Sequence, residues 1–217
     1  MFKHLFIFAV HLILIKTIMK KIIPSLGLVA LLIVSVSFIK PAKKEVYKID
    51  SQKSSIEWLA KKVTGQHGGT IKLASGQLET NGKALKSGSF SIDMNTIVCT
   101  DLQGEYNGKL IGHLRSEDFF SVEKNPISKF VITKVTAAGT DRANITGNLT
   151  IKGITQAITF PASVKKQGDA IVAVAKNVKV DRTKYDIRYG SKSFFASIGD
   201  KAIDDEFELS INLVATK

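Results

Sequence analysis

Cysteine is nearly absent from this chain, since Cys99 is the only one among its 217 residues. One thiol cannot close an intrachain disulfide, so the fold must be stabilised by its hydrophobic core. The sequence also lacks a tract of Lys and Arg with interleaved aromatic residues, which leaves nucleic-acid binding without support. It has no G-x-S-x-G nucleophile elbow, and we assign no catalytic residue.

Acidic residues are missing from the first 44 positions, which contain seven lysines and are otherwise mainly Leu, Ile, Val, Phe and Ala. Met19-Lys20-Lys21 forms a basic start, an uncharged run follows from Ile22 to Ile39, and Ser35-Val36-Ser37 supplies the small residues of a cleavage site. This order is typical of a secretory signal peptide. We predict that residues 1–40 are a targeting segment, cleaved after Ser37, with Met19 as a candidate true start.

An uncleaved N-terminal anchor is the alternative, because the 18 residues from Ile22 to Ile39 reach the lower limit for spanning a bilayer. No cysteine follows this apolar run, which disfavours a lipoprotein anchor. In either case the domain at residues 45–217 is expected to be exported, to the periplasm or an equivalent compartment. It would be membrane-anchored if residues 22–39 are retained, so membrane contact through this segment stays open.

The net charge is positive even without the N-terminal segment. Five of the 31 basic residues and none of the 19 acidic residues precede Pro41, so the remainder carries a net charge of +7. A moderate positive charge suits solubility or attraction to an anionic membrane face, and an evenly solvated surface is the simpler explanation.

From Val46 onward, apolar and polar residues alternate with period two, which places successive side chains on opposite faces of a strand. The clearest runs are Phe90, Ile92 and Met94; Ala143, Ile145, Leu149 and Ile151; and Phe207, Leu209, Ile211 and Leu213. Less regular runs are Ile56, Trp58 and Ala60; Phe130 and Ile132; Ile158, Phe160, Ala162 and Val164; and Val172, Val174, Val178 and Val180. Each strand is therefore expected to have one solvent-exposed face and one buried face.

Short turn motifs separate these runs, namely Lys152-Gly153, Asn81-Gly82 and Gln167-Gly168-Asp169. Between Leu73 and Leu78 the apolar residues change from odd to even positions, which indicates a β-bulge, most easily at Gly76. Eight or nine strands joined mainly by hairpins predict an all-β antiparallel meander that closes into a barrel or stacks as a sandwich. Closure would remove the exposed edges of such long strands.

Two segments interrupt the alternation. Leu110, Ile111 and Leu114 have helical spacing, and we predict a short helix or lid insertion near residues 105–120. Residues 181–200 form a long aromatic and cationic crossover loop before the last strand. Long irregular insertions in a compact domain are often the functional ones.

The segments "GKLIGHLRSEDFFSVEKNPISKF", "ITGNLTIKGITQAITFPASV" and "VKVDRTKYDIRYG" followed by "IGDKAIDDEFELSINLVA" resemble, in order and spacing, the YceI-like family. The resemblance covers about Val46 to Ala215, and the block with "HLRSEDFF" is its most specific part. It implies a lipocalin-like barrel of about eight antiparallel strands, export to the periplasm, and binding of long apolar molecules such as polyisoprenoids. Many relatives have Asp directly after the Phe pair, where this chain has Ser121, so no role of that carboxylate is carried over.

An eight-stranded barrel is wide enough either to be filled by its own side chains or to hold one slender ligand. Small inward residues favour a ligand, and the candidates are Ala60, Ala143, Gly147 and Ala162. We select as candidate ligand-binding residues Trp58, Phe90, His113, Phe119, Phe120, Phe130, Phe160 and Arg182. Phe119 and Phe120 would turn inward from the lid, or plug the barrel without touching a ligand. Arg182 could meet a phosphate head at the barrel mouth, or be an ordinary surface cation.

Other polar residues have simpler structural interpretations. His113 is more typical of a structural hydrogen-bonding residue than of a proton-transfer group. We assign no metal, because His113 with Glu117 offers only two ligands and the acidic group Asp200, Asp204, Asp205 and Glu206 lacks the spacing of a calcium loop.

The leading hypothesis is an exported binding protein that holds a polyisoprenoid, quinone or other lipid inside its barrel. One alternative is an enzyme or redox accessory acting on a quinone or lipid, and another is a filled barrel that serves as a stress-related interaction protein. No cofactor is expected beyond a bound isoprenoid or quinone as ligand, and a homodimer stays open.

Overall fold

The computed structural model describes residues 43–217, so the predicted targeting segment lies outside the described residues. Within this range the chain is mainly β-structure with one α-helix and two short 3-10 helices. The elements are β1 (Lys44–Ile49), β2 (Ser55–Lys62), β3 (Gly65–Asn81), β4 (Ala84–Cys99), α2 (Gly104–Arg115), β5 (Ile127–Ala137), β6 (Arg142–Ile151), β7 (Ile154–Gln167), β8 (Ala170–Asp181), η1 (Arg182–Tyr185), η2 (Gly199–Lys201) and β9 (Ile203–Thr216).

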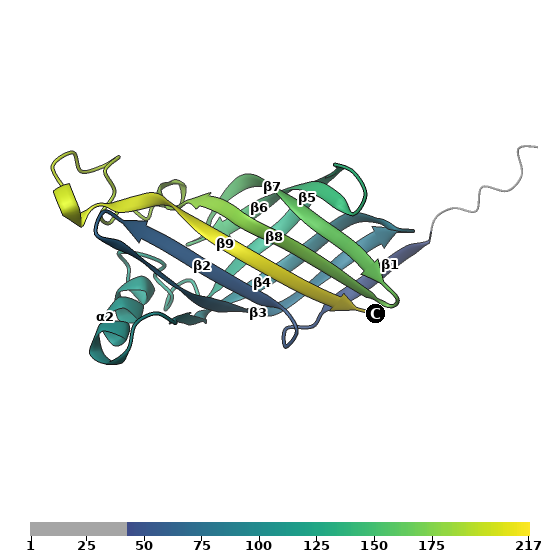
Figure 1. Ribbon diagram of the computed structural model, residues 1–217, viewed down its shortest axis with the longest axis horizontal. Coiled ribbons are helices and arrows are strands. Elements are labelled where there is room, and N and C mark those ends of the chain that lie inside the picture. Colours follow the sequence, from purple (N-terminus) through teal and green to yellow (C-terminus); the bar gives the residue numbers. More distant parts are fainter. Residues whose placement is uncertain (1–42) are drawn as a thin grey trace, which may run out of the picture. The chain divides into compact units, whose positions relative to one another are not determined.

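The strands form one antiparallel sheet that closes on itself (Figure 1). The order runs β3-β2-β9-β8-β7-β6-β5-β4, and pairing of β4 with β3 completes the barrel. β1 fills the same position as β2 between β3 and β9, because it pairs with the second half of β3 and with the end of β9. The barrel therefore has eight positions, one of which is shared by β1 and β2. This confirms the predicted barrel and excludes the sandwich.

Period-two alternation predicts the buried face of most strands correctly. On β6, Ala143, Ile145, Leu149 and Ile151 are buried, while Arg142, Asn144 and Asn148 between them are exposed. The same holds for Phe90 and Met94 on β4 and for Ile56 and Trp58 on β2. The hydrophobic core of the described residues consequently lies inside the barrel.

The predicted hairpins are all present. Lys152 and Gly153 connect β6 to β7 with φ values of 50° and 76°, the two left-handed positions that a two-residue type I′ turn requires. The predicted bulge on β3 also exists, although the register shift falls between Leu73 and Ser75 rather than at Gly76. Gly76 has another role, since a Cβ there would come within 3 Å of Phe90 and Ile49 side-chain atoms.

The prediction for β8 was wrong in its first half. The register shifts between Ala175 and Val178, and Asn177 has a left-handed φ of 54°. Val172 and Val174 pair with Val214 and Asn212, so they do not share the face of Val178 and Val180. Ala173 and Ala175 occupy that face instead, because they pair with the inward residues Leu213 and Ile211. A bulge that goes unrecognised exchanges the two faces of a strand.

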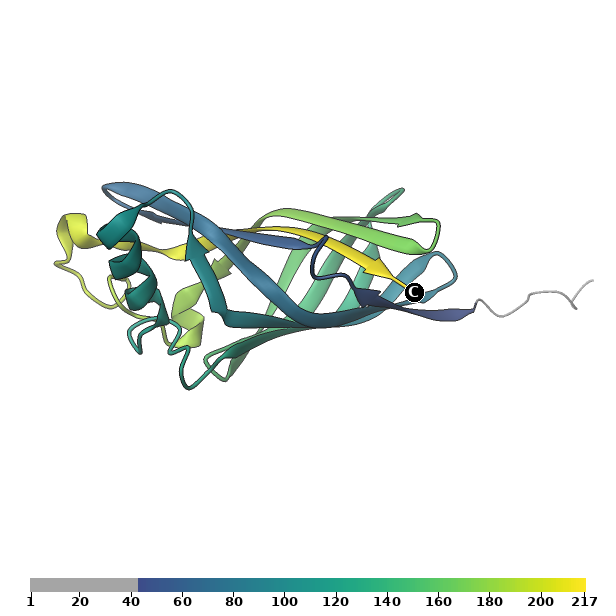
Figure 2. The ribbon, with the colours of Figure 1, turned by 90° about the horizontal axis from the view of Figure 1, so that it is seen from below.

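The two irregular segments lie at the same end of the barrel, opposite β1 and the C-terminus (Figures 1 and 2). The predicted helix is α2, and the predicted crossover contains η1 and η2. The chain thus places its longest non-strand segments together over one mouth of the barrel. Among residues 43–217, no helix is long and apolar enough to span a bilayer.

Candidate functional site

An internal cavity with a volume of about 190 Å³ occupies the barrel. One water molecule needs roughly 10–15 Å³ of such space, so the lumen is not filled by its own side chains. The cavity reaches from Leu78 and Leu85, near the β3–β4 hairpin, to Leu114 and Ile187 at the α2 end. Its wall is almost entirely aliphatic or aromatic, and the only charged or hydroxyl side chains in the lining belong to Ser128, Arg182 and Asp204. The arrangement suits an apolar guest.

Aromatic side chains from β4, β5 and β7 form one part of the cavity wall. The Phe130 ring lies between those of Phe90 and Phe160, with centroid distances of 6.3 and 5.7 Å. Gly147 on β6 makes room for Phe130, because a Cβ at that position would collide with the ring. Small residues from β2 and β8, Ala60, Ala173 and Ala175, also line the cavity.

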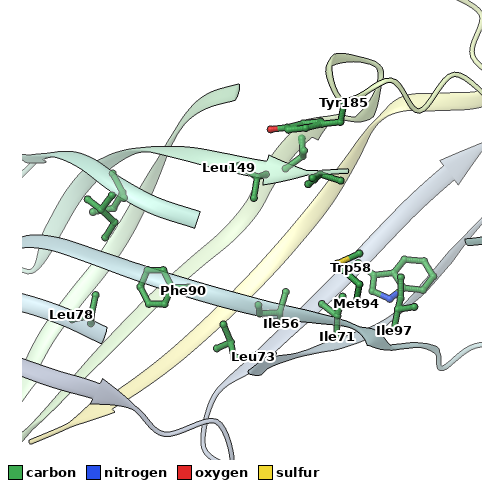
Figure 3. Packing of buried hydrophobic residues seen from close by; sticks show 14 of the residues in the cluster. Ile56, Trp58, Ile71, Leu73, Leu78, Phe90, Met94, Ile97, Leu149 and Tyr185 are labelled. Carbon is green, nitrogen blue, oxygen red and sulfur yellow. The ribbon is translucent and has the colours of Figure 1, made fainter. Parts of the chain in front are cut away.

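Trp58 on β2 lines the cavity close to the end of β4. Its side chain is buried, and the indole Nε1 donates a hydrogen bond of 3.2 Å to the Val98 carbonyl. Figure 3 shows the indole near Ile97 and Met94, with Phe90 further along the barrel. Because it is the only tryptophan in the chain, its fluorescence reports on the lumen alone.

Both phenylalanines that follow α2 turn inward. Phe119 is buried and Phe120 is half-buried, and both line the cavity. The turn that carries them is held by backbone hydrogen bonds, from Phe120 N to the Leu114 carbonyl and from Ser121 N to the Ser116 carbonyl. Phe120 also packs edge-to-face against Phe207, with a centroid distance of 6.4 Å. The pair closes the α2 end of the lumen.

His113 is the one candidate residue that does not line the cavity. Its ring packs edge-on against Tyr189 and Phe119, with centroid distances of 4.4 and 4.9 Å. Its Nε2 lies 3.2 Å from an Asp118 carboxylate oxygen. The imidazole therefore supports Phe119 from outside the lumen, in agreement with the structural interpretation of this residue.

Arg182 borders the cavity but uses its donors on the backbone. Its guanidinium donates hydrogen bonds of 2.8–3.0 Å to the carbonyl oxygens of Ile187, Tyr189, Ile203 and Asp204. The side chain is only 4% exposed, and burial lowers the pKa of the guanidinium, an effect that the carboxylates of Asp205 and Asp181 oppose. Arg182 therefore holds the crossover at residues 181–200 against the start of β9.

The weak metal candidates do not assemble. His113 faces Asp118 while Glu117 pairs with Lys124, and Glu206 pairs with Lys179 at 3.0 Å. A different group converges, since ligand atoms of His67, Cys99 and Asp101 all lie within 4.8 Å of one another. It is the one such group of three or more among residues 43–217. Sequence reasoning missed it because His67 is more than 30 positions from Cys99.

The comparisons with known proteins agree with this architecture. A family model described as the YceI-like domain matches residues 47–215. A UPF0312 protein of Pseudomonas aeruginosa PAO1 is 53% identical over 57 residues, covering 26% of this chain and 29% of the relative. A UPF0312 protein of Pseudomonas putida KT2440 is 30% identical over 125 residues, covering 56% of this chain and 63% of the relative. The aligned regions thus span less than two thirds of these relatives.

Two solved structures share the fold. BcnA of Burkholderia cenocepacia superposes with a TM-score of 0.63 at 22% identity, over 77% of this chain and 99% of that chain. A polyisoprenoid binding domain from Saccharophagus degradans gives a TM-score of 0.59 at 15% identity, over 82% and 99% of the two chains. Because the family model covers nearly all of the described residues, the chain belongs to the YceI-like family.

Proposed function

We propose that the barrel binds one elongated apolar or amphiphilic molecule, of the polyisoprenoid, quinone or lipid class, in its lumen. The observation that carries this proposal is the cavity of about 190 Å³ with an almost wholly apolar wall. The Saccharophagus degradans neighbour, a polyisoprenoid binding domain with the same fold, supports the choice of ligand class.

The expected binding energy comes from burial of the hydrocarbon. Each methylene-sized group removed from water contributes about 0.8 kcal/mol. Ten such groups would contribute about 8 kcal/mol before the ordering costs of binding are subtracted. Because hydrophobic contact has no direction, the wall would select a guest by width and length more than by functional groups.

A catalytic role has no observation in its favour. Within the described part of the chain, no histidine lines the cavity, and the hydroxyl of Ser128 donates its hydrogen bond to the Met94 sulfur rather than lying beside a base. A nucleophile needs an adjacent base to become reactive. The open lumen likewise argues against the filled-barrel alternative.

We also propose that the protein works outside the cytoplasm, because residues 1–40 have the order of a secretory signal. Sequencing the mature N-terminus tests this. A chain that begins at Phe38 supports cleavage and release, and a chain that retains residues 22–39 supports an anchor.

Native mass spectrometry of the protein purified from the expressing cell, followed by organic extraction, tests the ligand proposal. The wild-type chain is expected to carry an extractable apolar molecule. Ala162→Phe, which places a ring in the lumen from β7, is expected to lose it. Ala157→Phe is the matched control, since Ala157 lies exposed on the outer face of the same strand.

The two variants also report on the lumen itself. A ring added to a full core costs typically 1–3 kcal/mol, whereas a ring added to an open cavity does not. We therefore expect Ala162→Phe to unfold at nearly the same urea concentration as wild type once both proteins have been stripped of bound ligand. No bound molecule in wild type, together with strong destabilisation by Ala162→Phe, would refute the proposal.

A further inference from the structure

Three side chains with different ligand atoms meet where β3 and β4 approach the start of α2. Cys99 is the last residue of β4, His67 lies near the start of β3, and Asp101 is in the connection to α2. The Cys99 Sγ lies 2.9 Å from Asp101 Oδ1, and the His67 Nδ1 lies 3.2 Å from the same oxygen. Sulfur, imidazole nitrogen and carboxylate oxygen therefore face one point from three separate chain positions.

The sheet register builds this arrangement. Gly69 pairs with Cys99, and His67 follows on the same face of β3 because side chains two residues apart point the same way. Gly69 permits the close approach, since a Cβ there would collide with the Val98 carbonyl. Backbone pairing thus brings His67 and Cys99 together, and Asp101 follows Cys99 by two residues.

Surrounding hydrogen bonds hold two of the three residues in place. Gly68 N donates to the second Asp101 oxygen, Oδ2, at 2.9 Å, which leaves Oδ1 facing Cys99 and His67. The Asn107 amide donates to the Cys99 and Leu102 carbonyls at 2.9 and 2.8 Å, and so ties α2 to this connection. Partners of this kind orient metal ligands and fix their geometry.

We propose that His67, Cys99 and Asp101 form a binding site for a borderline divalent metal of the Zn²⁺ class. Ligand atoms about 2.0–2.3 Å from a tetrahedral ion lie roughly 3.3–3.7 Å from one another, and small side-chain shifts bring the observed separations to those values. Three protein ligands leave a fourth position for water, and the partial exposure of His67 and Asp101 gives that position access to solvent. The site is separate from the apolar lumen and does not depend on the proposed ligand.

Metal binding exchanges one proton. Without metal the thiol is protonated and donates to Asp101, because burial raises the pKa of Cys99. On binding, the S–H bond breaks, sulfur bonds to the metal, and the proton passes to the buffer, while the carboxylate and the neutral imidazole supply lone pairs. No oxidant or reductant takes part. Affinity should therefore increase with pH below the pKa of the thiol.

A bound ion would link β3 to the connection that leads into α2. That connection carries the helix and the Phe119 turn, which close one end of the barrel. The predicted consequence is a metal-dependent increase in the stability of the α2 end, since a ligand that binds only the folded state stabilises it.

Isothermal titration calorimetry with Zn²⁺ tests the proposal. The protein is used as purified from the expressing cell, after treatment with a chelator. We expect one equivalent to bind in wild type, and Cys99→Ser and His67→Gln each to weaken binding by at least about tenfold. His113→Gln is the matched control, because His113 also lies 3.2 Å from an aspartate, with similar exposure, but without a thiol. It is expected to bind as wild type does.

Co²⁺ supplies a spectroscopic readout that is independent of affinity. Binding through a thiolate gives a near-ultraviolet sulfur-to-metal charge-transfer absorption, which wild type should show and Cys99→Ser should lack. Absence of this absorption in wild type, equal Zn²⁺ affinity in wild type and Cys99→Ser, or an equal loss in His113→Gln would each overturn the proposal.

Discussion

The two ends of the barrel are closed in different ways. At the β1 end, regular strands bring Tyr47, Leu78 and Ala215 together, and each is almost completely buried. At the α2 end, irregular segments supply Phe119 and the crossover that Arg182 fastens through carbonyl contacts. Among residues 43–217, the exposed aromatic side chains gather on this second end, at Tyr106 of α2 and at Tyr189, Phe194 and Phe195 of the crossover. From this comparison we predict a fixed closure at the β1 end and an entrance for a ligand at the α2 end.

The β1 end owes its closure to one aromatic side chain and a group of charges. Tyr47 is fully buried, and its hydroxyl donates to Glu45 at 2.8 Å. Glu45 also accepts from Lys166 and Lys217 at 2.7 and 2.9 Å, and both ammonium groups lie within 6 Å of the Tyr47 ring. The charged groups cover the outer side of the Tyr47 ring, so this end of the barrel is apolar on its inner side and polar on its outer side.

Tyr47→Ala should produce the largest loss of stability. Removing a buried aromatic ring costs about 3–5 kcal/mol in free energy of unfolding, which urea denaturation would measure. Tyr47→Phe keeps the ring and should lose a much smaller part. If the two variants were equally unstable, the ring would not be what closes the β1 end.

Arg182→Lys should cause the second-largest loss of stability. An ammonium group cannot donate hydrogen bonds to all four carbonyl oxygens that the planar guanidinium contacts. Leaving one or two buried carbonyls without a donor costs about 2–3 kcal/mol in free energy of unfolding. Limited proteolysis should also cut residues 186–200 faster than in wild type. Unchanged cleavage would show that Arg182 does not fasten the crossover.

Phe119→Leu should change the rate of ligand release at the α2 end with little effect on stability. The swap keeps an apolar side chain and costs about 1 kcal/mol in stability. It also removes the aromatic contacts to His113 and Tyr189, so an apolar ligand should leave faster from the α2 end. Stopped-flow release, followed by Trp58 fluorescence, measures this rate. A rate equal to that of wild type would place the entrance elsewhere.

Glu45→Gln should have the smallest effect, and its sign depends on pH. Hydrogen bonds from Lys166, Lys217 and Tyr47 lower the pKa of Glu45 from 4.5 to about 2. A carboxyl whose pKa is lowered by folding stabilises the fold above its unfolded pKa, and that contribution is lost as pH falls from about 4.5 towards about 2. In acid denaturation, stability should therefore fall more steeply for wild type than for Glu45→Gln. Parallel curves would show that Glu45 does not contribute to the pH dependence of stability.

Local sequence patterns were sufficient for most of the fold. Alternation on β2, β4, β6 and β9 gave the inward faces, Lys152-Gly153 gave a hairpin, and the spacing of Leu110 and Leu114 gave α2. Seven of the eight candidate site residues line the cavity. Trp58, Phe90, Phe130 and Phe160 do so because an inward position on a closed barrel is a position in its wall, whereas Phe119, Phe120 and Arg182 reach the cavity from the irregular segments at the α2 end. Whether they contact a ligand is still a prediction.

What the sequence did not show depends on tertiary register. The bulge on β8 is hidden in a run of Val and Ala where either face looks apolar, and Asn177, a residue tolerant of left-handed φ, was its only signal. The Arg182 guanidinium donates to carbonyl oxygens that are distant in sequence, such as those of Tyr189 and Asp204. The convergence of His67 with Cys99 follows from a pairing that no local pattern encodes.

The affinity of the delipidated chain for linear isoprenoid alcohols of increasing length, followed by Trp58 fluorescence, tests the hollow-lumen account most directly. Binding free energy should rise by up to about 0.8 kcal/mol per added methylene-sized group and then level off when the lumen is full. In Ala162→Phe it should level off at a shorter chain, and in Ala157→Phe at the wild-type length. Affinity that does not change with chain length, or fluorescence that does not respond, would contradict the account.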